Sequence, residues 1–144
     1  MEGRAKMSLF VEGKEMWMNY PMIHSCIRVI DLKASETFYQ RAFGFEVSRK
    51  KDFPDGGFTL SYLRTPGQSF ELELTYNYDR KEPYVLGDGY SHLAVGVDDL
   101  KASHQRHAEL GLAPTPLKGL VEGNPRFYFL RDPDGYMIEV VRTP

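Results

Sequence analysis

Two histidines stand at matching places in the two halves of this 144-residue chain. His24 lies seven residues before Asp31, and His92 lies seven residues before Asp99. The surrounding segments, HSCIRVIDLKAS and SHLAVGVDDLKAS, are closely similar. Self-similarity of this kind indicates an internal repeat. Two halves that fold alike and pack with pseudo-symmetry would bring these equivalent histidines together.

Glutamates lie near the end of each half. Glu139 is in MIEVV, and Glu71 and Glu73 are both in ELELTYN. Glu71 and Glu73 share a strand face, so the residues alone leave both as candidates. Two imidazoles and two carboxylates would form a mixed nitrogen and oxygen site that suits Ni, Co, Zn, Fe or Mn and does not suit copper(I). The alternative is that the repeat retains these side chains for structural reasons, since strand histidines and glutamates commonly pack or face water.

Hydrophobic periodicity predicts the elements that position these residues. Residues 23–30 alternate as a strand does, and residues 32–43 have helical spacing between Asp31 as a cap and Gly44 as a stop. Shorter strand-like runs follow at 45–51, 58–65 and 70–77. The second half repeats the order, with strands at 92–97, 112–118, 126–132 and 136–141 and a helix at 100–111 that Asp98 or Asp99 caps. Each half is therefore predicted to be β-α-β-β-β, and the fold class to be α+β.

The same pattern divides the chain. We interpret residues 1–21 as an N-terminal appendage or leader and residues 22–79 as the first module. Residues 80–90, which are rich in proline, glycine and charge, are the expected linker, and residues 91–144 are the second module. Residues 22–144 would together form one domain.

Composition narrows the class of protein. Eighteen basic and twenty acidic residues give a formal charge of −2, which argues against a nucleic-acid or anionic-membrane partner. The lone Cys26 cannot form an intramolecular disulfide, and no apolar stretch approaches the roughly 18 residues that a membrane span needs. We therefore expect a cytoplasmic protein whose partners are small molecules and a second copy of itself.

Several segments carry a family resemblance. They are IHSCIRVIDLKASETFYQRAFGFEV, ELTYNY, YVLGDGYSHLAV and DPDGYMIEVV. Through them, residues 22–141 resemble the vicinal-oxygen-chelate superfamily (glyoxalase, bleomycin resistance and dioxygenase proteins), and within it the glyoxalase I, or lactoylglutathione lyase, family. The resemblance implies two tandem βαβββ modules that form an open, cupped mixed sheet with helices on the outside. It also implies a homodimer in which both chains bind each metal.

The resemblance further implies roles for individual residues. The implied metal ligands are His24, Glu73, His92 and Glu139, which selects Glu73 over Glu71. Glu139 would be the main base with Glu73 as its partner, and Arg28 and Asn77 would hold the glutamyl end of glutathione. The implied reaction is isomerisation of the methylglyoxal–glutathione hemithioacetal to S-lactoylglutathione, by proton transfer through an enediolate that a divalent metal stabilises. Nickel or cobalt is favoured over zinc, because the chain lacks the long insertions of zinc-dependent members.

Some features leave alternatives open. The segment KGLVEGNPRFYFLRD, with Lys118 and Arg126, departs from the glutathione-dependent pattern, so another low-molecular-weight thiol could be the co-substrate. The chain could instead be another metal-dependent enzyme of the superfamily, such as an epimerase, a thiol transferase or a dioxygenase, or a metal-free binding protein. We expect His104 and His107 at the helix surface because their neighbours are charged. Cys26 is expected to line the pocket.

Overall fold

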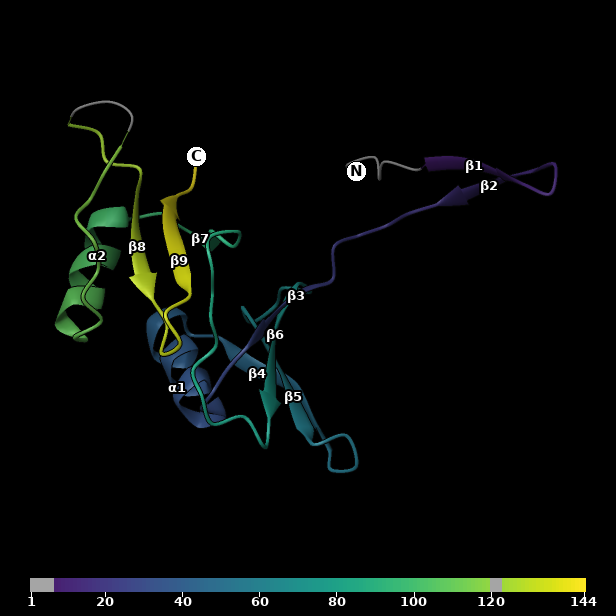
Figure 1. Ribbon diagram of the computed structural model, residues 1–144. Coiled ribbons are helices and arrows are strands. Elements are labelled where there is room, and N and C mark those ends of the chain that lie inside the picture. The colour runs from purple at the N-terminus through teal and green to yellow at the C-terminus, as the bar shows by residue number, and fades with distance from the viewer. Residues whose placement is uncertain (1–6, 120–122) are drawn as a thin grey trace.

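The computed structural model describes residues 7–119 and 123–144 (Figure 1). The first module consists of helix α1 and a four-stranded sheet. Its elements are β3 (His24–Arg28), α1 (Leu32–Phe43), β4 (Glu46–Phe53), β5 (Phe58–Arg64) and β6 (Glu71–Asn77). The strand order is β3-β6-β5-β4, with β3 parallel to β6 and the other neighbours antiparallel. The β-α-β-β-β order expected for the first half is confirmed.

The second module consists of helix α2 and a three-stranded sheet. Its elements are β7 (His92–Val97), α2 (Leu100–Glu109), β8 (Phe127–Arg131) and β9 (Met137–Arg142). The strand order is β7-β9-β8, in which β7 is parallel to β9 and β8 is antiparallel to it. This arrangement repeats that of β3, β6 and β5, so the α+β class and the tandem modules are confirmed. Within one chain the modules form two separate sheets.

The expectation of a strand at residues 112–118 is wrong. In this segment Lys118 forms an isolated bridge to Phe127, and the Thr115 N–H donates to the Phe129 carbonyl oxygen, but no continuous ladder forms. Pro114 and Pro116 lack the backbone N–H that a ladder requires, and Ala113 has a φ of 50°, which is not extended. The second sheet is therefore one strand narrower than the first.

Both helices begin as the sequence predicts. Asp31 and Asp99 are the N-caps, and each side chain accepts a hydrogen bond at 3.0 Å from a backbone N–H three residues on. Gly44 ends α1 in the left-handed conformation, with a φ of 69°, which glycine adopts without a Cβ penalty. No helix in the described ranges is long and apolar enough to cross a membrane.

The helices leave one face of each sheet uncovered. In the first sheet the covered face carries buried residues such as Ile27, Leu63 and Leu74. The alternating side chains form what we call the first open face, which comprises His24, Cys26, Arg28, Arg49, Lys51, Leu60, Tyr62, Glu71, Glu73, Thr75 and Asn77. The second open face includes His92, Ala94, Phe129 and Glu139.

A shared core and a polar junction connect the two modules. Buried Tyr39 and Leu74 of the first module belong to the same hydrophobic cluster as Tyr128 and Ile138 of the second. The Tyr39 hydroxyl donates a hydrogen bond of 2.8 Å to Asp132 Oδ2, and both groups are nearly fully buried. The backbone N–H of Ile30 donates at 2.9 Å to Asp134 Oδ1, and the Ser35 hydroxyl donates at 3.3 Å to Oδ2. The DPDG turn thus fixes the second module to the start of α1.

An N-terminal hairpin precedes the modules. Strands β1 (Met7–Val11) and β2 (Lys14–Met18) pair antiparallel and project away from the rest of the chain (Figure 1). Phe10 and Trp17 expose 77% and 61% of their surface. The hairpin lies within residues 1–21, the segment that we interpret as an appendage, and residues 1–6 lie outside the described part of the chain.

Candidate active site

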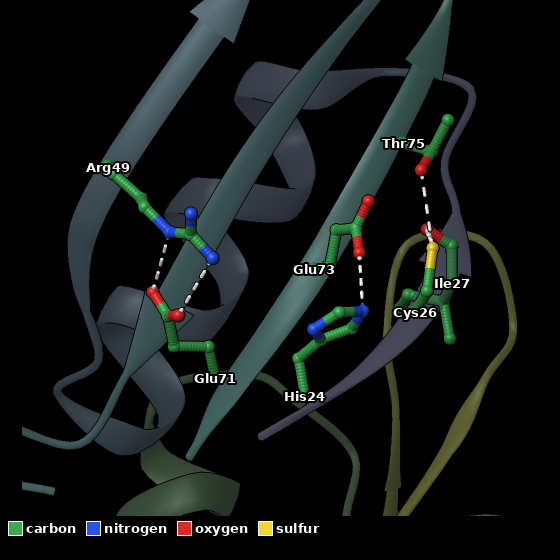
Figure 2. Close-up of polar contacts among 7 residues, drawn as sticks. All are labelled: His24, Cys26, Ile27, Arg49, Glu71, Glu73 and Thr75. Carbon is green, nitrogen blue, oxygen red and sulfur yellow. Dashed lines mark hydrogen bonds and ion pairs between the residues drawn. The ribbon is translucent and has the colours of Figure 1, made fainter. Parts of the chain in front are cut away.

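His24 and Glu73 form a close pair on the first open face. The register of the parallel strands β3 and β6 places Glu73 beside Cys26, two residues along β3 from His24. The Glu73 side chain nevertheless reaches back, so that Oε2 lies 3.0 Å from His24 Nε2 (Figure 2). Glu73 is 8% exposed, whereas His24 is exposed on the open face. The pair presents an imidazole nitrogen and a carboxylate oxygen at one point, the two donor types that a borderline divalent metal binds.

Glu71 has different partners, although it shares the face. Its carboxylate accepts a hydrogen bond at 3.1 Å from Arg49 Nη2 (Figure 2). It accepts another from the Ser48 hydroxyl. These bonds lower the pKa of Glu71, the Ser48 bond most of all. Since its oxygens are already engaged away from His24, the geometry favours Glu73 as the partner of that histidine.

The second open face holds a looser version of the same pair. His92 Nε2 lies 3.8 Å from Glu139 Oε2. The other ring nitrogen, Nδ1, lies 2.7 Å from the Ser91 hydroxyl, and the ring meets Phe129 edge to face at 5.3 Å. A hydrogen bond at Nδ1 leaves Nε2 as the nitrogen available for a ligand.

The chain does not bring the two pairs together. Across residues 7–119 and 123–144, no three His, Cys, Asp or Glu side chains are grouped so that they could hold a metal ion. Each open face therefore presents two possible metal donors. A complete set of four would need one open face of each kind from two chains.

The two residues expected to bind the thiol also lie on the first open face. Arg28 is exposed on the same side of β3 as His24. Asn77 is half-buried at the end of β6, and its Nδ2 donates a hydrogen bond of 3.0 Å to the Tyr84 hydroxyl in the linker. The structure thus places both side chains on the sheet face that carries His24 and Glu73.

Tyr62 is a site neighbour that the sequence analysis missed. It is paired with Glu73 in the antiparallel register of β5 and β6, and its ring meets His24 edge to face at 6.0 Å. Desolvation and then the charge of Glu73 raise the pKa of this tyrosine. The Arg49 guanidinium lies 3.8 Å from the centre of the Tyr62 ring. The alternation of FTLSYLRT was the signal that could have found Tyr62, because it places Tyr62 on the strand face opposite to that of the buried Leu63.

The expectation for His107 is wrong. It is 2% exposed, and its Nε2 lies 2.7 Å from the Ala42 carbonyl oxygen of α1 while Nδ1 lies 2.7 Å from the Tyr128 hydroxyl. Burial lowers the pKa of this histidine, so it is a neutral core residue that joins the modules. His104 is half-buried, with Nε2 2.9 Å from the Thr115 carbonyl oxygen.

Two other features noted in the sequence are Cys26 and the loop that contains Lys118 and Arg126. Cys26 is exposed on the first open face, with Sγ 3.2 Å from Thr75 Oγ1 (Figure 2). In the loop expected to alter the thiol pocket, the Arg126 backbone N–H donates at 2.7 Å to the Lys118 carbonyl oxygen. Residues 120–122 of that loop lie outside the described part of the chain.

Tandem modules that each present a histidine–glutamate pair on an open face define a class of α+β proteins, and comparisons with known proteins identify the family. Residues 22–140 match the family model described as "Glyoxalase/Bleomycin resistance protein/Dioxygenase superfamily". The chain is therefore a member of this superfamily.

Individual relatives are similar over most of their length. A probable lactoylglutathione lyase of Synechocystis sp. is 37% identical over 128 residues, which cover 85% of this chain and 95% of the relative. A lactoylglutathione lyase of Neisseria meningitidis is 38% identical, with 84% of this chain and 89% of the relative covered. The structure of the trypanothione-dependent glyoxalase I of Leishmania major has a TM-score of 0.73 and 35% identity, with 86% of this chain and 87% of that chain covered.

Proposed function

We propose that this protein is a glyoxalase I-type lyase, which isomerises the methylglyoxal–glutathione hemithioacetal to S-lactoylglutathione. The relatives that carry the lactoylglutathione lyase name match nearly their whole length. The observation that carries the proposal is the contact between His24 and Glu73 on one open face, repeated by His92 and Glu139 on the other. A protein that only sequesters a small molecule has no need of two such pairs.

The active form is a homodimer with two shared sites. Each site takes His24 and Glu73 from one chain and His92 and Glu139 from its partner, since the four side chains do not converge within one chain. A two-fold dimer makes both sites equivalent. The proposed metal is nickel or cobalt in preference to zinc. When bound, it would act as a Lewis acid that stabilises negative charge on the substrate oxygens. The proposed location of this enzyme is the cytoplasm.

The chain's own residues carry out the proton transfer. Glu139 removes the proton from C1 of the hemithioacetal and returns it to C2, and Glu73 faces the substrate from the opposite side. A positioned carboxylate contributes on the order of 10²–10⁴-fold to such a transfer. Arg28 and Asn77 hold the glutamyl end of the thiol, which fixes the reacting carbons near the carboxylates. Tyr62 closes one side of the site beside Glu73.

The test is an isomerase assay on metal-stripped dimer with methylglyoxal and glutathione, after addition of Ni, Co, Zn or Mn separately. We expect activity to return with nickel or cobalt and to fall on the order of 10²-fold or more in Glu139→Gln at saturating metal. Glu109→Gln, an exposed change on α2, is the matched control. Metal binding without turnover on glutathione, trypanothione or other thiols would refute the lyase function and favour another reaction of the superfamily.

A further inference from the structure

The first open face carries a row of residues that crosses all four strands of its sheet. The register aligns Arg28 of β3 with Thr75 of β6, Thr75 with Leu60 of β5, and Leu60 with Lys51 of β4. The neighbouring row runs from Cys26 through Glu73 and Tyr62 to Arg49. Lys51 therefore lies on the same face as the proposed metal ligands, on the far side of Tyr62 from β3.

Lys51 differs from the other cations of β4 and β5 in its partners. Arg49 is paired with Glu71 at 3.1 Å, and Arg64 with Glu46 at 2.9 Å. Lys50, which points to the helix side, is paired with Glu36 at 2.9 Å. The exposed Lys51 ammonium has no hydrogen-bond or ion-pair partner among residues 7–119 and 123–144, and it lies 5.0 Å from the centre of the Phe53 ring. Its charge is thus free to bind an anion.

The proposed function indicates which part of the substrate would lie near the Lys51 ammonium. The thiol's glutamyl end lies at Arg28 and Asn77, over β3 and β6, and the reacting carbons lie near Glu73. Lys51 lies in the row of Arg28 but across the sheet from it, so the aldehyde-derived part would reach Lys51 by extending sideways from Glu73, over β5 and β4. Strand spacings of about 4.8 Å and a rise of about 3.4 Å per residue put the Cα atoms of Lys51 and Glu73 roughly 12 Å apart. The flexible four-carbon stem of lysine spans much of that distance.

We propose that Lys51 binds a carboxylate carried by the aldehyde-derived part of the substrate, so that the protein prefers hemithioacetals of acidic 2-oxoaldehydes. This inference rests on the proposed function and names the substrate class for the same site. Leu60, the register partner of both Lys51 and Thr75, forms the wall between Lys51 and the reacting carbons, beside Arg49 stacked on Tyr62. A 2-oxoaldehyde of five carbons with a terminal carboxylate has the length to pass this wall.

The test compares two aldehydes that differ only at the end of the chain. These are 4,5-dioxopentanoate, which ends in a carboxylate, and 2-oxopentanal, which ends in a methyl group, each with glutathione and the metal-loaded dimer. We expect the wild-type kcat/KM to favour the carboxylate. In Lys51→Met the ratio of the two kcat/KM values should fall about tenfold, as expected for loss of one charge-assisted contact. Lys51→Arg should retain the ratio, and added salt should reduce it.

Lys33→Met is the matched control, because it removes the same charge from an exposed position on α1, away from the open face. Its ratio should equal that of the wild type. Equal losses for both aldehydes in Lys51→Met, or a wild type with no preference for the carboxylate, would overturn the Lys51 subsite while leaving the lyase function intact. Absence of turnover with either aldehyde and with methylglyoxal would overturn both.

Discussion

His24 Nε2 and Glu73 Oε2 lie 3.0 Å apart across two parallel strands, although Glu73 is not the register partner of His24. The side chains therefore converge by orientation, on the face that the helices leave uncovered. The corresponding atoms of His92 and Glu139 are 3.8 Å apart on a different sheet. The proposed division of the site between two chains can be tested by mixing two defective chains.

Glu73→Ala and Glu139→Ala should each abolish isomerase activity as pure dimers, because each removes a ligand from both sites. A dimer with one chain of each kind has one site with both defects and one intact site. Random exchange of subunits after mild denaturation should therefore restore about one quarter of wild-type activity, since half of the dimers are mixed. Mixing Glu73→Ala with His24→Ala, whose defects lie in the same half-site, should restore none and serves as the control.

The contribution of Arg28 can be separated from that of the carboxylates. Arg28→Gln should raise KM for the glutathione hemithioacetal about tenfold with a smaller change in kcat, because a charge-assisted contact to a remote part of the substrate is lost. Steady-state kinetics at fixed metal measure the two constants. Arg41→Gln, an exposed change in the last turn of α1, should alter neither. A drop in kcat alone would place Arg28 at the reacting carbons instead of the thiol.

Local sequence signals predicted the parts of the fold that depend on local interactions. Asp31 caps α1 and Gly44 ends it, as the sequence indicated. For α2 the sequence offered Asp98 or Asp99, and the cap is Asp99, through a backbone N–H three residues away. The repeat likewise predicted the matching positions of the two histidines. These features need only a few neighbouring residues, so an isolated segment carries the necessary information.

Features that depend on distant residues were less predictable. His107 is buried because α2 packs against Ala42, which is 65 residues earlier in the chain. Glu71 and Glu73 share a face, and only the hydrogen bonds of Ser48 and Arg49 to Glu71 show that its carboxylate is engaged elsewhere. Tyr62 becomes a site neighbour through strand pairing, which periodicity does not specify.

Asp132 should make the stability of the domain depend on pH. Burial, the largest effect, raises the pKa of Asp132 from 3.8 to about 6, against the opposing effect of the hydrogen bond from Tyr39. The folded state then holds the proton more tightly than the unfolded state, so the free energy of unfolding falls as pH rises from about 4 to about 6. The loss amounts to about 3 kcal/mol at 1.36 kcal/mol per pKa unit.

Asp132→Asn should remove this loss. The amide keeps the Oδ1 acceptor for the backbone N–H groups of Asp134 and Tyr136, and it needs no ionisation. Urea unfolding at pH 4 and pH 7 should show the variant gaining about 2 kcal/mol on the wild type, most of the full difference. Asp55→Asn, in the exposed turn before β5, is the control and should follow the wild type. A constant difference between Asp132→Asn and wild type would mean that Asp132 stays ionised throughout.

Removal of the N-terminal hairpin should leave the domain unaffected. Strands β1 and β2 contact mainly each other, and a two-stranded hairpin contributes little stability without further packing. A chain that starts at Pro21 should therefore unfold within about 2 °C of the full chain, because no buried contact of the modules is lost. It should also keep kcat/KM for the hemithioacetal within about twofold. Calorimetry and the isomerase assay measure both, and Trp17→Ser in the full chain tests the exposed face alone. A fall of the unfolding temperature by more than about 5 °C would show that the hairpin packs on the modules or on the partner chain.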